Sequence, residues 1–157
     1  MNKREDIYKI TSVVLMLDQF IKIIIMKNME LNTKITLIPN FFSLFYVKNT
    51  GAAFSIFKNN TLFLIILSVI IVVILDRYIK KEKEFTKLSI FSLGIIMGGI
   101  FGNLLDRIIH HSVIDYLSFN IINYSFPIFN LADIGITVGV VLLLIESIRK
   151  DKKIKKK

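Results

Sequence analysis

The stretch LFLIILSVIIVVIL, residues 62–75, is apolar except for Ser68 and decides the fold. With its flanks it reaches the roughly 20 helical residues needed to cross a hydrocarbon core about 30 Å thick. Three other stretches have similar length, so the sequence predicts an all-α integral membrane protein with four transmembrane helices. The predicted spans are residues 7–26, 61–79, 88–105 and 128–148.

The composition indicates one membrane-embedded unit. Of the 157 residues, 54% are hydrophobic, and the mean hydropathy of +0.62 is too high for a soluble domain of this size. We therefore expect a single domain over residues 1–157. The lack of cysteine excludes disulfides, thiolate metal sites and a cysteine nucleophile. The first span carries Asp18 and Lys22 and has no Ala-x-Ala-like cleavage site after it, which favours a retained helix over a removed signal peptide.

The basic residues predict the orientation. A formal net charge of +9 would also suit a nucleic-acid-binding protein, but the Lys and Arg residues cluster beside the apolar spans, so we expect no nucleic-acid partner. The N-terminal residues, the loop 76–87 and the C-terminal tail hold 15 of the 21 basic residues. The positive-inside rule then places both termini and this loop in the cytoplasm.

Two segments are expected outside the membrane. Residues 28–60 are rich in β-branched and aromatic residues and contain the turn signal Lys-Asn-Thr-Gly at 48–51. We expect them to form a small extracytoplasmic β-sheet between the first and second helices, resting on the outer leaflet. The second segment, residues 106–127, is expected to be a short connection.

Four aspartates are expected at one depth near the outer leaflet. Asp18 lies inside the first span, Asp106 closes the third, Asp115 follows it, and Asp133 lies in the first turns of the fourth. Ionisable groups at membrane depth are costly and commonly mark a functional site. The sequence therefore predicts an active site near the outer leaflet.

Other polar residues lie at helical spacing from these acids. Asp18 and Lys22 are spaced i, i+4 and are able to pair on one helix face. A pair that merely tolerates burial is the favoured interpretation of Lys22, and contact with a substrate or a neighbouring carboxylate is the alternative. Asn103 and Arg107 are expected to orient the acids and compensate their charge. The glycines of the third and fourth spans are expected only to permit close packing of helices. They are Gly94, Gly98, Gly102, Gly135 and Gly139.

The motif around Asp133 leaves two interpretations open. Asn130 followed three residues later by an acid resembles a helix N-cap with its capping partner, and a catalytic role is equally compatible. Asp115 favours catalysis, because two carboxyls within a few Å would share one proton and would polarise a water and protonate a leaving amine. Since the positive end of the fourth helix favours charge on Asp133, Asp115 is the expected proton carrier. The adjacent His110 and His111 diverge and make a poor metal clamp, and we expect neither metal nor cofactor.

Five blocks of sequence, taken in order, match one known family. They are DQFIK at 18–22, NTGAAF at 49–54, GGIFGNLLDR at 98–107, VIDY at 113–116 and FPIFNLAD at 126–133. In their order and topological positions they resemble the bacterial lipoprotein signal peptidases, also called signal peptidase II, over residues 18–139. Each block alone is a weak signal, and the five together are specific.

The resemblance implies a four-helix aspartic endopeptidase of the bacterial cytoplasmic (inner) membrane that needs no cofactor. It implies removal of the signal peptide from diacylglyceryl-modified prolipoproteins just before the lipidated cysteine, in contact with membrane lipid, and inhibition by the cyclic peptide globomycin. We expect the chain to act as a monomer.

The resemblance also assigns residues to the site. Asp115 and Asp133 match the catalytic dyad. The positions that match residues shaping or supporting the site are Asp18, Lys22, Asn49, Gly51, Asn103, Asp106, Arg107, Asn130 and Ala132. The chain departs from the family at Ile134, where many members have a small hydroxyl residue, and it has aromatic variants at Phe54 and Tyr116.

Two other function classes are compatible with the same acids. A small transporter or proton relay would need polar groups at several depths, whereas the second span has almost none. A noncatalytic membrane scaffold would use Asp133 only as a cap and the glycines only for packing. We favour the peptidase, in which the dyad activates water without a covalent intermediate and residues 49–54 clamp the signal peptide.

Overall fold

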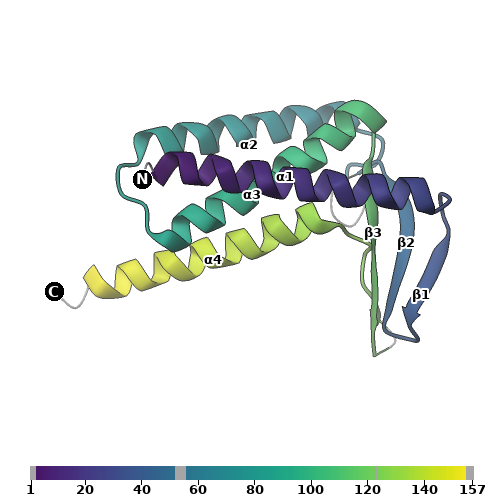
Figure 1. Ribbon diagram of the computed structural model, residues 1–157. Helices are drawn as coiled ribbons and strands as arrows, with labels where there is room; N and C mark the ends of the chain where they lie inside the picture. The colour runs from purple at the N-terminus through teal and green to yellow at the C-terminus, as the bar shows by residue number, and fades with distance from the viewer. Residues whose placement is uncertain (1–2, 52–55, 123, 155–157) are drawn as a thin grey trace.

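The structure is a computed structural model that describes residues 3–51, 56–122 and 124–154. Part of the expected clamp, including Phe54, and the end of the basic tail lie outside the described residues. The described elements are α1 (Lys3–Asn28), β1 (Lys34–Ile38), β2 (Phe42–Asn49), α2 (Thr61–Lys81), α3 (Lys87–His110), β3 (Val113–Ile121), β4 (Tyr124–Ser125) and α4 (Leu131–Ile154). In Figure 1 the helices run side by side, and α1 begins and α4 ends at the end of the bundle away from the sheet.

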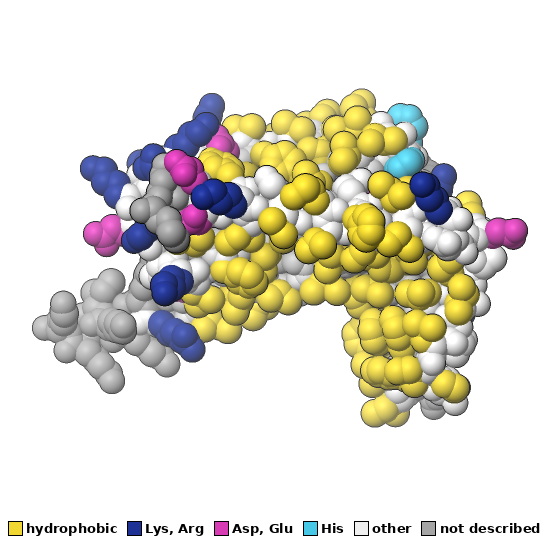
Figure 2. Space-filling view, viewed as in Figure 1, with side chains coloured by type: hydrophobic (Ala, Val, Ile, Leu, Met, Phe, Trp, Pro, Cys, Tyr) yellow, Lys and Arg dark blue, Asp and Glu magenta, His cyan; other side chains and the backbone are white. Residues whose placement is uncertain are grey.

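Three of the described helices are long and apolar enough to cross a membrane. They are α2, α3 and the part of α4 from Leu131 to Arg149. The chain is thus a membrane protein with four described helices and a small antiparallel sheet. Passage of the more highly charged α1 through the membrane stays a prediction. Figure 2 shows hydrophobic side chains over the flanks of the bundle, with Lys and Arg gathered at the end where α1 begins.

Helix α3 is the centre of the bundle, with α1 and α4 packed against it. Every residue from Ser92 to Ile100 is buried, so the helix is covered all around. At Gly98, a Cβ atom would lie 2.6 Å from the Val14 Cβ and 2.9 Å from the Thr11 carbonyl oxygen. At Gly102, a Cβ atom would collide with the carboxylate of Asp18. The expectation that these glycines permit close helix packing is confirmed.

The antiparallel sheet has the strand order β1-β2-β3-β4 and combines two distant parts of the chain. Strands β1 and β2 lie between α1 and α2 as expected, but β3 and β4 lie between α3 and α4, where the prediction of a short connection was wrong. The first four residues of β3 are all buried, so the strand lacks the alternation of apolar and polar residues that reveals a half-exposed strand. In Figure 1 the sheet projects sideways from one end of the bundle.

Several helix boundaries also differ from the predicted spans. Helix α3 continues past the predicted end at 105 to His110, and α4 begins at Leu131 instead of 128. The charges of Asp106 and Arg107 indicated a helix end, yet both residues are buried within the protein, where polar partners compensate them. The helix ends only where His111 adopts a left-handed conformation with φ of 56°.

Candidate active site

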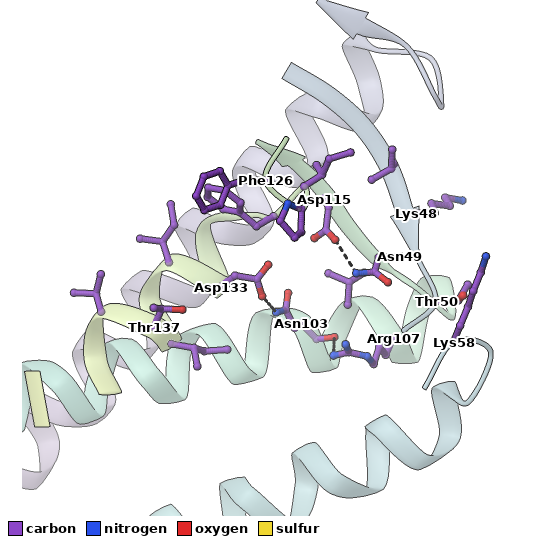
Figure 3. A pocket seen from close by; sticks show the side chains of 18 residues that line it. Lys48, Asn49, Thr50, Lys58, Asn103, Arg107, Asp115, Phe126, Asp133 and Thr137 are labelled. Carbon is purple, nitrogen blue, oxygen red and sulfur yellow. Dashed lines mark hydrogen bonds between the residues drawn. The ribbon is translucent and has the colours of Figure 1, made fainter. Parts of the chain in front are cut away.

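A cavity of about 970 Å³ lies where the sheet meets the helical bundle. Asp115 of β3 and Asp133 of α4 both line it, and Figure 3 shows their carboxyl groups directed into the same space. Asn49, Asn103 and Arg107 add further polar groups, whereas residues 126–129 and the α4 side chains beyond Asp133 make one wall largely apolar. A cavity of this size, roughly 300–1,000 Å³, with few convergent polar groups is typical of a ligand-binding site.

Asp115 is held by two side-chain amides from different elements. It is 2% exposed. The amide nitrogen of Asn49 on β2 donates to Asp115 Oδ2 at 3.0 Å, and that of Asn130 donates to Oδ1 at 2.7 Å. Because each oxygen of the carboxyl group accepts a hydrogen bond, the orientation of the group towards the cavity is fixed.

Asp133 has both of the features that its motif suggested. Its backbone N–H donates to Asn130 Oδ1 at 3.0 Å, and the Asn130 N–H donates back to Asp133 Oδ2 at 3.2 Å, which is a reciprocal helix cap. Its other oxygen, Oδ1, accepts a hydrogen bond of 2.8 Å from the Asn103 amide. The cap positions this carboxyl group in the cavity, so capping and lining the cavity are compatible.

The environment of Asp115 alters its protonation. Burial, followed by the negative charge of Asp133, raises the pKa of the Asp115 carboxyl from 3.8 to about 7. The hydrogen bonds from Asn49 and Asn130 act in the opposite direction and lower this pKa. This pKa suits a group that holds a proton near neutral pH, and the role of Asp115 as the proton carrier stays a prediction. The described hydrogen bonds of the two carboxyls all come from amides, so a proton shared directly between them stays a prediction.

Arg107 links the cavity to the segment between β2 and α2. Its buried guanidinium donates to the Gly51 carbonyl at 3.0 Å and to the Asn103 carbonyl at 3.4 Å. The Gly51 N–H in turn donates to the side-chain oxygen of Asn49 at 2.9 Å. A chain of polar contacts thus runs from Asp115 through Asn49, Gly51 and Arg107 to Asn103, the partner of Asp133.

A second group of charged residues lies behind the cavity. The Lys22 ammonium is 2.7 Å from Asp18 Oδ2 and 2.8 Å from Asp106 Oδ2. It also donates to Asn103 Oδ1 at 3.1 Å. All three charged side chains are at most 1% exposed. Lys22 therefore satisfies both interpretations of the sequence, because it neutralises Asp18 and also contacts a neighbouring carboxylate.

Each acid of this group holds the residue before one of the cavity acids. Asp106 accepts the backbone N–H of Ile114 at 3.0 Å, and Ile114 directly precedes Asp115. Asp18 accepts the N–H of Ala132 at 3.0 Å, and Ala132 directly precedes Asp133. The charged group behind the cavity consequently fixes the backbone of both elements that carry the cavity acids.

The structure brings all the predicted site residues into these two groups or into direct contact with them. Five line the cavity itself, namely Asn49, Asn103, Arg107, Asp115 and Asp133. Gly51 and Asn130 connect them, and the remaining four, Asp18, Lys22, Asp106 and Ala132, form the group behind. Their roles in chemistry stay predictions.

Gln19 and Tyr116 make polar contacts in the site although they were not predicted to belong to it. The Gln19 amide donates to Asp106 Oδ1 at 2.9 Å and to the Gly102 carbonyl at 3.2 Å. The Tyr116 hydroxyl accepts the Leu131 N–H at 3.2 Å at the start of α4. An amide inside an apolar span was a usable signal for Gln19. The contact of Tyr116 depends on the pairing of distant elements and has no local signal.

The comparisons with known proteins agree with this arrangement. The family model for signal peptidase II (SPase II) matches residues 10–149. The chain belongs to the signal peptidase II family. It is therefore a hydrolase, a membrane aspartic peptidase that removes signal peptides from bacterial lipoproteins.

Two solved structures of bacterial membrane enzymes, determined by the in meso method at 2.3 and 1.9 Å resolution, are similar to the chain. The first superposes with a TM-score of 0.87 at 31% sequence identity, over 94% of this chain and 90% of the other. The second has a TM-score of 0.78 at 32% identity, over 87% of this chain and 88% of the other. This signal peptidase II chain thus shares its fold with both enzymes over nearly their whole length.

Proposed function

We propose that Asp115 and Asp133 are the catalytic dyad with which the chain cleaves diacylglyceryl-modified prolipoproteins before the lipidated cysteine. The observation that carries this proposal is the convergence of two carboxyl groups from separate elements on one cavity. One of them, Asp115, has a pKa of about 7, which suits a group that must hold and release a proton near neutral pH.

The proposed reaction is a direct attack of water on the scissile carbonyl. Asp133 takes a proton from the water while the water oxygen bonds to the carbonyl carbon. Asp115 then gives its proton to the peptide nitrogen as the carbon–nitrogen bond breaks. The products are the carboxylic acid of the signal peptide, which then loses its proton to solvent, and the free amine of the lipidated cysteine. Transfer of one proton from Asp133 to Asp115 restores the starting state.

Asn103 and Arg107 support this chemistry in different ways. The Asn103 oxygen accepts from Lys22 and Asn130, so its amide nitrogen must face Asp133. The Arg107 guanidinium is held beside the cavity by carbonyl groups, where its positive charge offsets part of the negative charge of the dyad. Both residues are proposed to position or compensate the acids without exchanging protons.

The membrane placement follows from charge and exposed apolar surface. Because Lys22 lies between two acids, α1 carries little unpaired charge and is proposed as the fourth span. The Lys and Arg residues gathered where α1 begins support a cytoplasmic position for both termini. The site then lies at the outer leaflet of the cytoplasmic membrane, with the exposed Leu37 and Ile122 of the sheet region resting on lipid. We also propose that the chain acts as a monomer and is inhibited by globomycin.

The function is tested with a synthetic peptide that spans the cleavage site and carries diacylglyceryl on its cysteine. The purified chain is expected to release a signal peptide that ends just before this cysteine, and globomycin is expected to stop the release. The matched control is the same peptide with an unmodified cysteine, which should stay intact. Folded protein that binds the lipidated peptide without shortening it would contradict the proposal.

The cleavage rate is expected to fall as the pH rises above about 7. Asp115 must be protonated to serve the leaving amine, and its raised pKa of about 7 means that it loses this proton at higher pH. The protonated fraction then drops about tenfold for each further pH unit. The measurement is kcat/KM between about pH 5 and 9.

The variant Asn49→Ala sharpens this test. The Asn49 amide lowers the pKa of Asp115, so its removal is expected to move the falling limb of the profile to higher pH. A limb that stays in place or moves to lower pH would assign the titration to another group.

A further inference from the structure

A second, smaller recess of about 250 Å³ lies between α1, α3 and α4. It is open at the surface of the bundle, where Leu17 is 50% and Phe91 is 47% exposed. All of its lining residues are apolar, and they are Val14, Leu17, Phe91, Ile95, Leu131, Ile134, Gly135 and Val138. These side chains offer no hydrogen-bonding partner, so the recess suits a hydrocarbon chain better than an extended peptide, whose backbone groups would stay unsatisfied.

This recess and the catalytic cavity share a ridge of side chains. Ile134 and Val138 lie one turn apart on α4 and line both spaces. Asp133 and Thr137 line the cavity alone, and Gly135 lines the recess alone. The two spaces therefore lie on opposite sides of the ridge formed by Ile134 and Val138. This ridge begins at Ile134, the residue that follows Asp133.

We propose that the diacylglyceryl group of the substrate straddles this ridge. One acyl chain lies along the apolar wall of the catalytic cavity, and the other lies in the recess between α1, α3 and α4. The inference rests on the proposed function, because the two chains belong to a glyceryl group on the cysteine next to the scissile bond. That bond must lie at Asp133, so the branch point of the lipid comes close to Ile134.

The direction of the recess matches the path of an acyl chain. It extends from Leu131 at the start of α4 to Val138, a rise of roughly 10 Å at 1.5 Å per residue. Helix α4 starts at the sheet end of the bundle and runs away from it (Figure 1). A chain that leaves the glyceryl group near Asp133 thus runs along the helix towards the interior of the bilayer.

The recess is tested by filling it from α1. The variant Leu17→Trp adds bulk inside the recess, and Met16→Trp is the matched control, because Met16 is 62% exposed and outside both linings. Leu17→Trp is expected to raise KM about five-fold for a peptide with two palmitoyl chains, a modest change because the displaced chain moves into lipid instead of water. It is expected to leave kcat/KM for the matching dibutyryl peptide within about two-fold of wild type. An equal loss of kcat/KM on both peptides, or no loss of kcat/KM on either, would overturn the proposal.

Photo-crosslinking on the inactive variant Asp115→Asn separates this inference from the proposed function. A lipopeptide with a diazirine on each acyl chain is expected to label residues on both sides of the ridge, including Leu17 or Phe91. A phospholipid with the same diazirine chains is expected to be displaced from the recess by unlabelled lipopeptide. Labelling of the recess by phospholipid alone would overturn the proposal, and so would labelling from a diazirine placed in the signal peptide. Failure of the wild-type chain to cut the unmodified lipopeptide would instead count against the proposed function.

Discussion

Asp115→Asn and Asp133→Asn are each expected to lower kcat on a diacylglyceryl peptide by about 10²–10⁴-fold. An amide keeps the shape of the carboxyl group but neither takes a proton from water nor gives one to the leaving amine. The Asn side chain at 133 keeps an oxygen that is able to accept the Asn130 N–H, so the start of α4 should be preserved. The measurement is single-turnover cleavage, with thermal unfolding in detergent to show that both variants stay folded.

The control for the dyad variants is Glu30→Gln. Glu30 is an exposed carboxylate that follows α1 at the sheet end of the bundle and lies outside the cavity lining. The Glu30→Gln change removes one negative charge, as each dyad variant does, and is expected to leave kcat unchanged. Normal processing by both dyad variants would show that the reaction uses other groups, and a large loss in Glu30→Gln would point to a general effect of charge.

Lys22→Met is expected to destabilise the protein by about 3–5 kcal/mol, the usual cost of removing one partner from a buried ion pair. The change leaves the carboxylates of Asp18 and Asp106 side by side without the ammonium that lies 2.7 and 2.8 Å from them. It also removes a hydrogen bond to Asn103, the residue that directs its amide to Asp133. We expect a large loss of both folded protein and activity, measured by unfolding in detergent and by the cleavage assay.

The two effects of Lys22 are separable by neutralising its partners. In Lys22→Met combined with Asp18→Asn and Asp106→Asn, no unpaired buried charge remains, so stability should largely return. The activity should stay low, because Asn103 still lacks the ammonium that orients it. The matched control is Lys27→Met, five residues further along α1 on its exposed surface. Equal stability of Lys22→Met and Lys27→Met would contradict the importance of the buried charged group.

The sequence predicts the local parts of this fold well. The apolar run at 62–75 identifies α2 without any other information, and the i, i+4 spacing predicts the contact between Asp18 and Lys22. The cap formed by Asn130 and Asp133 is also local, since its two residues are three apart. Such features depend on spacing within one helix and can be read directly from the chain.

The parts that the sequence did not reveal depend on contacts between distant segments. Asp106 was taken as a helix end, because its partner Lys22 lies on another helix and only tertiary packing brings the two together. Strand β3 was taken as a connection, because burial of its first residues on both faces removes the alternating pattern. The recess beside α4 likewise depends on three helices at once.

An irregularity in strand pairing determines which chemical group meets Asp115. Strand β2 has one extra residue between Leu44 and Val47, after which Val47 lies opposite Asp115 and Asn49 opposite Val113. Because facing residues project to the same side and sides alternate, this places Asn49 on the side of Asp115, as its hydrogen bond confirms. A regular ladder would have turned Lys48 to that side instead. An ammonium there would favour the ionised carboxyl, so in the proposed mechanism a single inserted residue decides whether Asp115 is able to hold the proton that it donates.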